Sequence, residues 1–250
     1  MRLDRILSEA GAASRSQAAR LIRARRVTVD GAVVRDPSAH ADPETAAVAV
    51  DGVPVAWRRF RYFLLHKPAG FVSATEDRGP TVMELLPPTL ARGTFPCGRL
   101  DIDTTGLLLI TNDGALAHRL LSPRRHVDKT YRFSCEPPIG EEARRALCAG
   151  VDIGGGIVTM PASVTLFGEA PSGAGEITVH EGKFHQIKRM FEAVGSRITA
   201  LSRVRFGPLT LDGTLSPGAW RPLTEAEIAA LRQAGGVGAP EEEAGENEDE

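Results

Sequence analysis

Two aspartates stand next to an apolar run in the stretch GRLDIDTTGLLLITNDG, which covers residues 98–114. Asp101 and Asp103 are two positions apart, so both side chains would face the same side of an extended segment. Carboxylates in such a place either shape a turn at the mouth of a buried strand or serve as acid, base or nucleophile. The residues alone do not choose between these roles. Asp113 needs no chemical role, because it suits the N-cap of the helix that follows it.

Other common catalytic sites are missing from the sequence. The six histidines show no HExxH motif and no pair at i, i+4, and the three cysteines lie far apart with no CxxC pair. GxSxG and the P-loop pattern are absent, and the glycines at 154–156 precede the strand-like IVTMP, which favours a hairpin turn over a phosphate loop. A metal-dependent nuclease built on Asp101 and Asp103 would need further clustered acids. We therefore expect no metal and no cofactor, and catalysis by carboxylate, tyrosine and cation.

Lysine is rare in this chain. The 30 basic residues comprise 26 arginines and 4 lysines. Lysine and arginine differ in donor geometry and in the ease with which their pKa shifts. The few positions that keep lysine are therefore candidates for a specific role. They are Lys67, Lys129, Lys183 and Lys188.

The net charge of −2 hides two opposite ends of the chain. Residues 241–250 hold seven acids and no base, so the rest of the chain carries about +5, whereas residues 1–35 hold eight arginines against three acids. The basic start favours a polyanionic partner, and we expect 235–250 to be a disordered acidic tail that aids solubility. No apolar run reaches the roughly 18 residues of a membrane span, and the charged start is unlike a signal peptide. We therefore expect a cytoplasmic protein.

The first 45 residues have the pattern of a small module with two helices and a hairpin. Apolar residues at i, i+3, i+4 and i+7 predict a helix over 2–11. Ser14 is a suitable N-cap for a second helix with the sequence RSQAARLIRARR. Asp30-Gly31, within VTVDGAVV, is a strong signal for a β-hairpin.

Four arginines of the second expected helix, Arg15, Arg20, Arg23 and Arg26, fall within an arc of about 140°. Such a face is either solvated or binds phosphate, and the scarcity of nearby acids favours phosphate. The helices and hairpin together resemble the small αL RNA-binding module of ribosomal proteins, in which the helical face grips structured RNA.

The turn-rich residues 46–60 are expected to finish this module and lead out of it as a linker. From 61 to 234, short strand-like runs alternate with helical pieces, which indicates an α+β domain. The predicted strands are 62–66, 107–111, 130–135, 176–180 and 209–211. The predicted helices are 115–121, 141–149, 185–194 and 224–233.

Five segments, in this order along the chain, resemble bacterial pseudouridine synthases of the RsuA type. GRLDIDTTGLLLITNDG, DKTY and EGKFHQIKRMFEAVG are similar to the three signature segments of that family. HKPAGFVSATEDRGPTV and GAWRPLTEAEIAAL also fit it, and the αL module is its usual leading domain. The resemblance covers about residues 1–232. It implies a catalytic domain with a mixed, mainly antiparallel sheet flanked by helices.

The family isomerises uridine in RNA: uracil is cut from its ribose at nitrogen, turned, and rejoined through carbon, without a cofactor. The resemblance places the nucleophile at Asp101, the aspartate of the RLD motif. Asp101 would attack the anomeric carbon or the uracil ring, or accept a sugar proton, and the sequence leaves these open. A carboxylate in a pocket closed over a base needs a cation to stay ionised. The resemblance supplies Lys188, which by itself would be an ordinary solvated helix lysine.

The resemblance implies further roles around Asp101. Tyr131 in DKTY matches the family's active-site tyrosine, whose ring would stack on the flipped uracil and whose hydroxyl is a candidate for proton transfer. Without the resemblance, Tyr131 is an ordinary strand tyrosine. Ile187 would form part of the apolar wall, and Arg99 would fill the gap left by the extruded base. The remaining candidates for RNA contacts around the mouth are Lys67, Lys183, His185 and Arg189.

LDIDTTGLLLITNDG and SPRRHVDKTYRF look closer to the small-subunit branch of the family than to the large-subunit branches. This favours one uridine of 16S rRNA, in ribosomal RNA or in a small-subunit assembly intermediate. The alternatives are a 23S rRNA synthase of the same family and a non-catalytic rRNA-binding or ribosome-assembly protein. The presence of Asp101, Tyr131 and Lys188 favours the enzyme. Nothing in the sequence argues against a monomer or points to a membrane.

Overall fold

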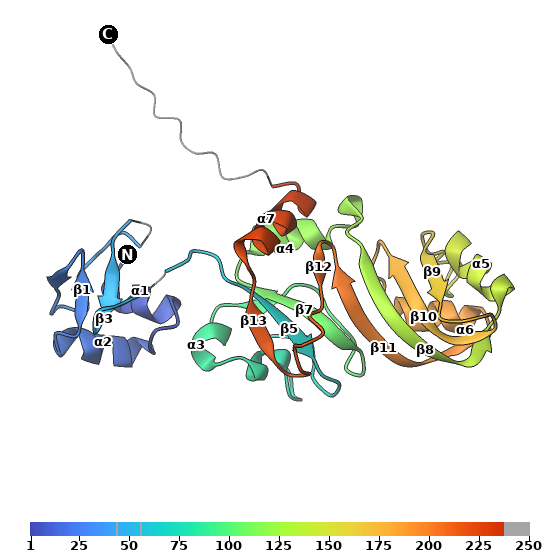
Figure 1. The fold of residues 1–250 in the computed structure, drawn as a ribbon, viewed down its shortest axis with the longest axis horizontal. Helices are drawn as coiled ribbons and strands as arrows, with labels where there is room; N and C mark the ends of the chain where they lie inside the picture. Colours follow the sequence, from blue (N-terminus) through green and yellow to red (C-terminus); the bar gives the residue numbers. More distant parts are fainter. Residues whose placement is uncertain (44, 56, 238–250) are drawn as a thin grey trace, which may run out of the picture. The chain divides into compact units, whose positions relative to one another are not determined.

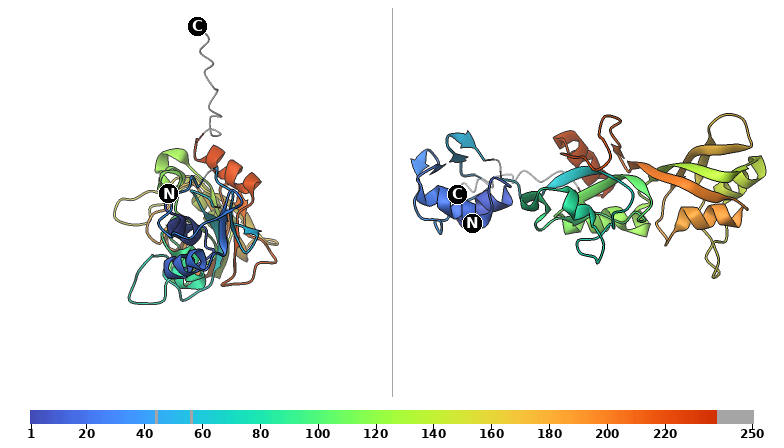
Figure 2. Two further views of the ribbon diagram at one scale, coloured as in Figure 1. Left: turned by 90° about the vertical axis from the view of Figure 1, so that its left-hand side faces the viewer. Right: turned by 90° about the horizontal axis from the view of Figure 1, so that it is seen from below.

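The chain folds into two compact units, as seen in a computed structural model (Figures 1 and 2). The residues that the structure describes are 1–43, 45–55 and 57–237. The first unit comprises Met1–Arg61 and Leu86–Phe95, and the second comprises Tyr62–Leu85 and the chain from Pro96 onward. Each unit has its own β-sheet. Most of the expected acidic tail, from residue 238 onward, lies outside the described residues.

The first unit packs helices on a small antiparallel sheet with the strand order β2-β1-β3-β4. Its elements are α1 (Leu3–Glu9), α2 (Arg15–Arg23), β1 (Val27–Val29), β2 (Ala32–Val33), β3 (Val48–Val50), β4 (Val53–Pro54) and α3 (Pro88–Ala91). Ser14 caps α2 as predicted, because its side chain accepts a hydrogen bond from the Gln17 backbone. The apolar stripe of α1 and the buried face of α2 meet in one core, whose members include Leu3, Ile6, Leu7, Ala18, Ile22 and Val27.

The expected second helix is shorter than the sequence indicates. It ends at Arg23, and Arg25 adopts a left-handed conformation with φ of 61°. Arg26 therefore lies beyond the helix, where its guanidinium forms an ion pair with Asp51 at 2.5 Å. The prediction that Arg26 shares the helical face was wrong. The exposed arginines of α2 are Arg15, Arg20 and Arg23.

The first unit also extends further than predicted. Residues 46–60 were expected to be a linker, but they contain the hairpin of β3 and β4, and β3 pairs with β1. Both hairpins turn at an aspartate followed by glycine, Asp30-Gly31 and Asp51-Gly52, and all four residues have positive φ. Such two-residue turns match the twist of the paired strands.

The second unit is built on a mixed sheet with the order β13-β5-β7-β11-β8-β10-β9. All neighbours are antiparallel except β7 and β11, which run parallel. Its strands are β5 (Tyr62–Lys67), β7 (Thr105–Thr111), β8 (Lys129–Ile139), β9 (Ser163–Leu166), β10 (Ser172–Val179), β11 (Arg197–Phe206), β12 (Leu209–Thr210) and β13 (Trp220–Pro222), and β6 (Phe95–Pro96) lies where the chain enters this unit. Its helices are η1 (Val82–Leu85), α4 (Gly114–Leu121), η2 (Pro123–Arg125), α5 (Glu141–Ala149), α6 (Gln186–Ala193) and α7 (Glu225–Ala234).

The predicted class, α+β with a mainly antiparallel sheet flanked by helices, is confirmed. Each strand and helix predicted for this unit is present, and most ends shift by one or two residues. β8 continues four residues beyond its predicted end, and β10 begins four residues before its predicted start. Asp113 caps α4 as expected, because its carboxylate accepts a hydrogen bond from the Leu116 backbone at 2.9 Å. α4 lies beside α7 (Figure 1), and α6 packs against β11 (Figure 2, right).

Gly106 is required where β7 meets β11. It pairs with Arg203 in the parallel register and has φ of +105°. A Cβ built on Gly106 would lie 2.3 Å from the Arg203 carbonyl oxygen. Only glycine allows the two backbones to approach this closely. The glycine that follows the two threonines after Asp103 therefore lets the start of β7 pair with β11, the central strand of the sheet.

Candidate active site

The loop that precedes β7 carries both aspartates of the opening motif. The Lys188 ammonium on α6 lies 3.0 Å from Asp101 Oδ2 and 2.6 Å from Asp103 Oδ1. The expected pairing of residues 101 and 188 is therefore present in the structure. Lys188 also pairs with Asp103, which the sequence interpretation did not foresee.

The fold of α6 explains how Lys188 reaches this loop. Ile187, Met190 and Phe191 are buried on the inner face of the helix, and the Phe191 ring lies 4.7 Å from that of Phe133 on β8. Lys188 stands at the edge of this face with 22% of its side chain exposed. The helix is thus anchored on the sheet while its lysine points to the aspartates.

The electrostatics of this cluster favour the ionised forms of Lys188 and Asp103. Although burial opposes the charge of Lys188, its hydrogen bonds to Asp103 and Asp101 raise the pKa of the ammonium above its ordinary value. The hydrogen bond from Lys188 lowers the pKa of the Asp103 carboxyl. His185 Nε2 lies 3.6 Å from Asp101 Oδ1, so a second basic side chain stands on the other oxygen. The site is open rather than closed: 29% of the Asp101 side chain and 65% of that of Asp103 are exposed.

Lys67, at the end of β5, is completely buried. Its ammonium donates hydrogen bonds to four backbone carbonyls, those of Pro68 at 3.1 Å, Asp101 at 3.0 Å, Ile102 at 3.2 Å and Thr104 at 2.8 Å. Burial lowers the pKa of Lys67 to about 8. The expected RNA contact is wrong for this residue, because its charge is held inside the protein. It instead fixes the backbone of the aspartate loop.

Two other expected RNA contacts are engaged within the protein. Lys183 forms an ion pair with Glu181. The Arg189 guanidinium donates to the carbonyl oxygens of Ile153, Gly154 and Phe184, so it ties the turn around residue 154 to the segment before α6. Arg99 is exposed beside the aspartate loop, where it is available to solvent.

Tyr131 is brought toward the site by the register of the sheet. It pairs with Arg203 on β11, which pairs with Gly106 on β7, which in turn pairs with Lys67 on β5. Residues in one row across a sheet share a face. Tyr131 is 9% exposed, and Ile187 on α6 is 5% exposed. Both side chains are therefore largely buried.

Arg203 is a buried residue of this row that the sequence interpretation missed. Its side chain is 2% exposed, and its Nε donates to the Leu107 carbonyl at 2.8 Å. The guanidinium lies 5.1 Å from the centre of the Phe206 ring. No local signal marks Arg203, because it stands in a segment rich in arginine.

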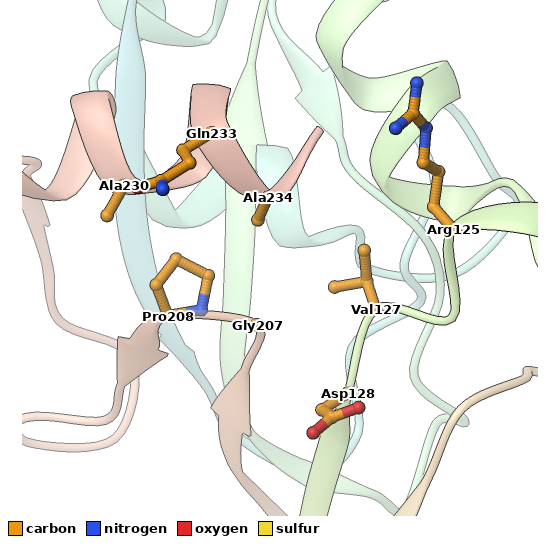
Figure 3. A pocket seen from close by; sticks show the side chains of 8 residues that line it. All are labelled: Arg125, Val127, Asp128, Gly207, Pro208, Ala230, Gln233 and Ala234. Carbon is orange, nitrogen blue, oxygen red and sulfur yellow. The ribbon is translucent and has the colours of Figure 1, made fainter. Parts of the chain in front are cut away.

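A separate hollow of about 400 Å³ lies between α7 and the loop before β8 (Figure 3). Val127, Gly207 and Ala230 are among its lining residues, and none of the predicted site residues lines it. Within the described residues, no three His, Cys, Asp or Glu side chains are placed to hold a metal ion. Among the helices that the structure describes, each is too short or too polar to span a bilayer.

Comparison with known proteins identifies the family. A solved structure described as a pseudouridylate synthase superimposes with a TM-score of 0.66 at 35% sequence identity, covering 92% of this chain and 99% of that one. The family model for RNA pseudouridylate synthase matches residues 61–193, which include the loop of Asp101, the strand of Tyr131 and the helix of Lys188. The chain belongs to the RNA pseudouridylate synthase family.

Two relatives that match almost the whole of this RNA pseudouridylate synthase are also named as pseudouridine synthases. The Bacillus subtilis protein YtzG, named as an uncharacterized RNA pseudouridine synthase, is 44% identical over 236 residues, which is 93% of this chain and 99% of that protein. The Escherichia coli K12 protein named ribosomal small subunit pseudouridine synthase A is 44% identical over 234 residues, 92% of this chain and 100% of its own. Residues 1–45 match the S4 domain, which is where the exposed arginines of α2 lie.

Proposed function

We propose that this synthase converts one uridine of 16S ribosomal RNA to pseudouridine, with Asp101 as the reacting carboxylate. The assignment of Asp101 rather than Asp103 rests on the RLD motif of residues 99–101, and the 3.0 Å contact between Asp101 and Lys188 supports it. The 16S substrate is supported by the names of full-length relatives from several bacteria. An rRNA substrate would place the protein in the cytoplasm, acting on rRNA or on a small-subunit assembly intermediate.

The reaction is an isomerisation, so it needs no other reactant. The bond from N1 to C1′ breaks, the bond from C5 to C1′ forms, C5 loses its proton and N1 gains one. Asp101 must be ionised for each version of the first step, whether it attacks C1′, attacks the uracil ring or accepts a sugar proton. The Lys188 ammonium, 3.0 Å from Asp101 Oδ2, would hold this carboxylate in place.

The neighbouring residues support the flipped base. Tyr131 offers a buried aromatic face, and Ile187 offers an apolar side chain, so uracil would stack against the first and contact the second. The phenol of Tyr131 is also a candidate to help remove the C5 proton. Arg99, which is exposed, would enter the space left in the RNA. All of these residues come from one chain, so a monomer would suffice.

The test of Asp101 compares two carboxylate variants. Asp101→Asn should abolish conversion of transcribed 16S rRNA while RNA affinity stays within about twofold, because most affinity comes from phosphate and shape. Asp103→Asn removes the other carboxylate on Lys188 and should keep at least a tenth of the wild-type rate. Near wild-type activity of the Asp101→Asn protein would contradict the assignment.

The substrate is tested in a strain that lacks this protein. Mapping pseudouridines in 16S and 23S rRNA should show one missing site in 16S rRNA. Loss of a pseudouridine only from 23S rRNA would contradict the 16S substrate and assign the protein to a large-subunit branch of the family. Unchanged modification of both RNAs, with binding retained, would favour a non-catalytic role in ribosome assembly.

A further inference from the structure

An aromatic side chain stands exposed next to the aspartate cluster. Phe184, two residues before α6, is 76% exposed. Its ring stacks on the imidazole of His185, with centres 3.8 Å apart and planes at 18°. His185 in turn lies 3.6 Å from Asp101. A single exposed apolar residue is ordinary on a protein surface, but this ring stacks on a side chain that lies beside Asp101.

The segment that carries Phe184 is braced on both sides. The Gln186 side chain accepts a hydrogen bond from the Lys183 backbone at 2.9 Å and donates to Glu181 at 2.8 Å. Arg189 donates to the Phe184 carbonyl at 3.3 Å. His185 is held in a left-handed conformation with φ of 48°, which a residue with a side chain rarely adopts without such support. The ring is therefore carried by a turn that several side-chain hydrogen bonds hold in place.

We infer that Phe184 is a stacking platform for a base of the substrate RNA that neighbours the target uridine. One face of the ring stacks on His185, yet 76% of the residue is exposed to solvent. A plate for the extruded uracil itself would be buried in the site, as Tyr131 is. Phe184 thus takes a base that stays in the strand at the mouth, which positions the target over Asp101. This inference rests on the proposed function.

Fluorescence of 2-aminopurine tests this stacking directly. The probe is a synthetic 16S rRNA fragment with 2-aminopurine immediately 5′ or 3′ of the mapped uridine, bound to Asp101→Asn protein so that no reaction occurs. We expect the protein to quench one of these two positions. Adding Phe184→Ala or Phe184→Leu should remove that quenching and weaken binding about five- to hundredfold, and Phe184→Tyr should restore both.

Two comparisons decide the result. Leucine keeps the apolar bulk but has no π-face, so wild-type quenching and affinity in Phe184→Leu would overturn the inference. Phe167, which is also exposed (44%), provides the matched control: Phe167→Ala should change neither quantity. Because binding is measured in the Asp101→Asn protein, loss of quenching reports on Phe184 alone. If Asp101→Asn itself remains active, the proposed nucleophile fails whatever the fluorescence shows.

Discussion

At the scale of single residues, two carboxylates share one ammonium, and they are not equivalent. Asp103 is closer to Lys188 and more exposed, whereas Asp101 is farther from it and more protected. Asp101 Oδ2 contacts Lys188, while its Oδ1 is 3.6 Å from the imidazole of His185, beyond hydrogen-bond length. The two carboxylates therefore differ in exposure and in their basic neighbours. Comparing the Asp101→Asn and Asp103→Asn variants tests the proposal that Asp101 is the one that reacts.

Replacing Lys188 tests whether the reaction depends on the ammonium that contacts both aspartates. In Lys188→Met, Asp101 and Asp103 lose the ammonium that contacts both, and the pKa of the Asp103 carboxyl, which the hydrogen bond from Lys188 lowers, should rise. We expect single-turnover conversion at pH 7 to fall at least about tenfold, because Asp101 loses the contact that orients it. Lys188→Arg keeps the charge and should retain more activity. A Lys188→Met rate within twofold of wild type across pH would contradict this role.

At the scale of elements, the row that joins Lys67, Gly106, Arg203 and Tyr131 aligns four strands at the site. Its tightest point is Gly106. Gly106→Ala should destabilise the fold by roughly 1–3 kcal/mol from the backbone conformation alone, and by more from the contact with Arg203. Urea denaturation measures this loss. Gly213→Ala, at an open position with no atom within 4 Å, is the control and should change stability little. Equal stability of the two variants would rule out the close approach.

Lys67 ties the aspartate loop to the end of β5. Because its pKa is lowered, the stability of the folded protein should depend on pH. The folded protein releases this proton near pH 8, whereas the unfolded chain holds it until about 10.5, so between these values the unfolded state binds more protons. Stability of wild type relative to Lys67→Met should therefore rise from pH 8 to 10.5, by about 3 kcal/mol in total. Urea denaturation of both proteins at several pH values measures the difference. A difference that stays constant would mean that Lys67 titrates normally.

The sequence predicted most elements of the second unit but missed the strand at its centre. β11 has register shifts between Ile198 and Ala200 and between Arg203 and Arg205, which break the alternation by which strands are recognised. It also buries Arg203, a residue typical of surfaces. Lys67 was predicted to contact RNA, and its burial could not be read from the sequence either. Its four carbonyl partners come together only in the folded loop, and no local pattern announces them.

At the scale of the whole molecule, the aspartate cluster belongs to the second unit and the exposed arginines of α2 belong to the first. The family resemblance placed Asp101, Tyr131 and Lys188 in the second unit, and the structure brings Asp101 and Lys188 into contact. The first unit offers the exposed arginines of α2, among which Arg20 and Arg23 extend from the outer surface of the helix. A large RNA needs affinity from many phosphates as well as one reactive group. We therefore expect these arginines to contribute to binding but not to the chemical step.

The salt dependence of binding tests this division. Replacing Arg20 and Arg23 by glutamine should reduce the slope of log K against log salt by about 1.5. Each phosphate contact that is lost lowers the number of counterions that binding releases from the RNA. Filter binding of transcribed 16S rRNA between low and moderate salt measures the slope. The control replaces Arg144 and Arg145 of α5, which pair with Glu141, and changes net charge equally. If α2 grips phosphate, only the first pair alters the slope, while single-turnover rates at saturating protein stay the same for both. Equal slopes for the two variants would mean that overall charge, rather than the face of α2, attracts the RNA.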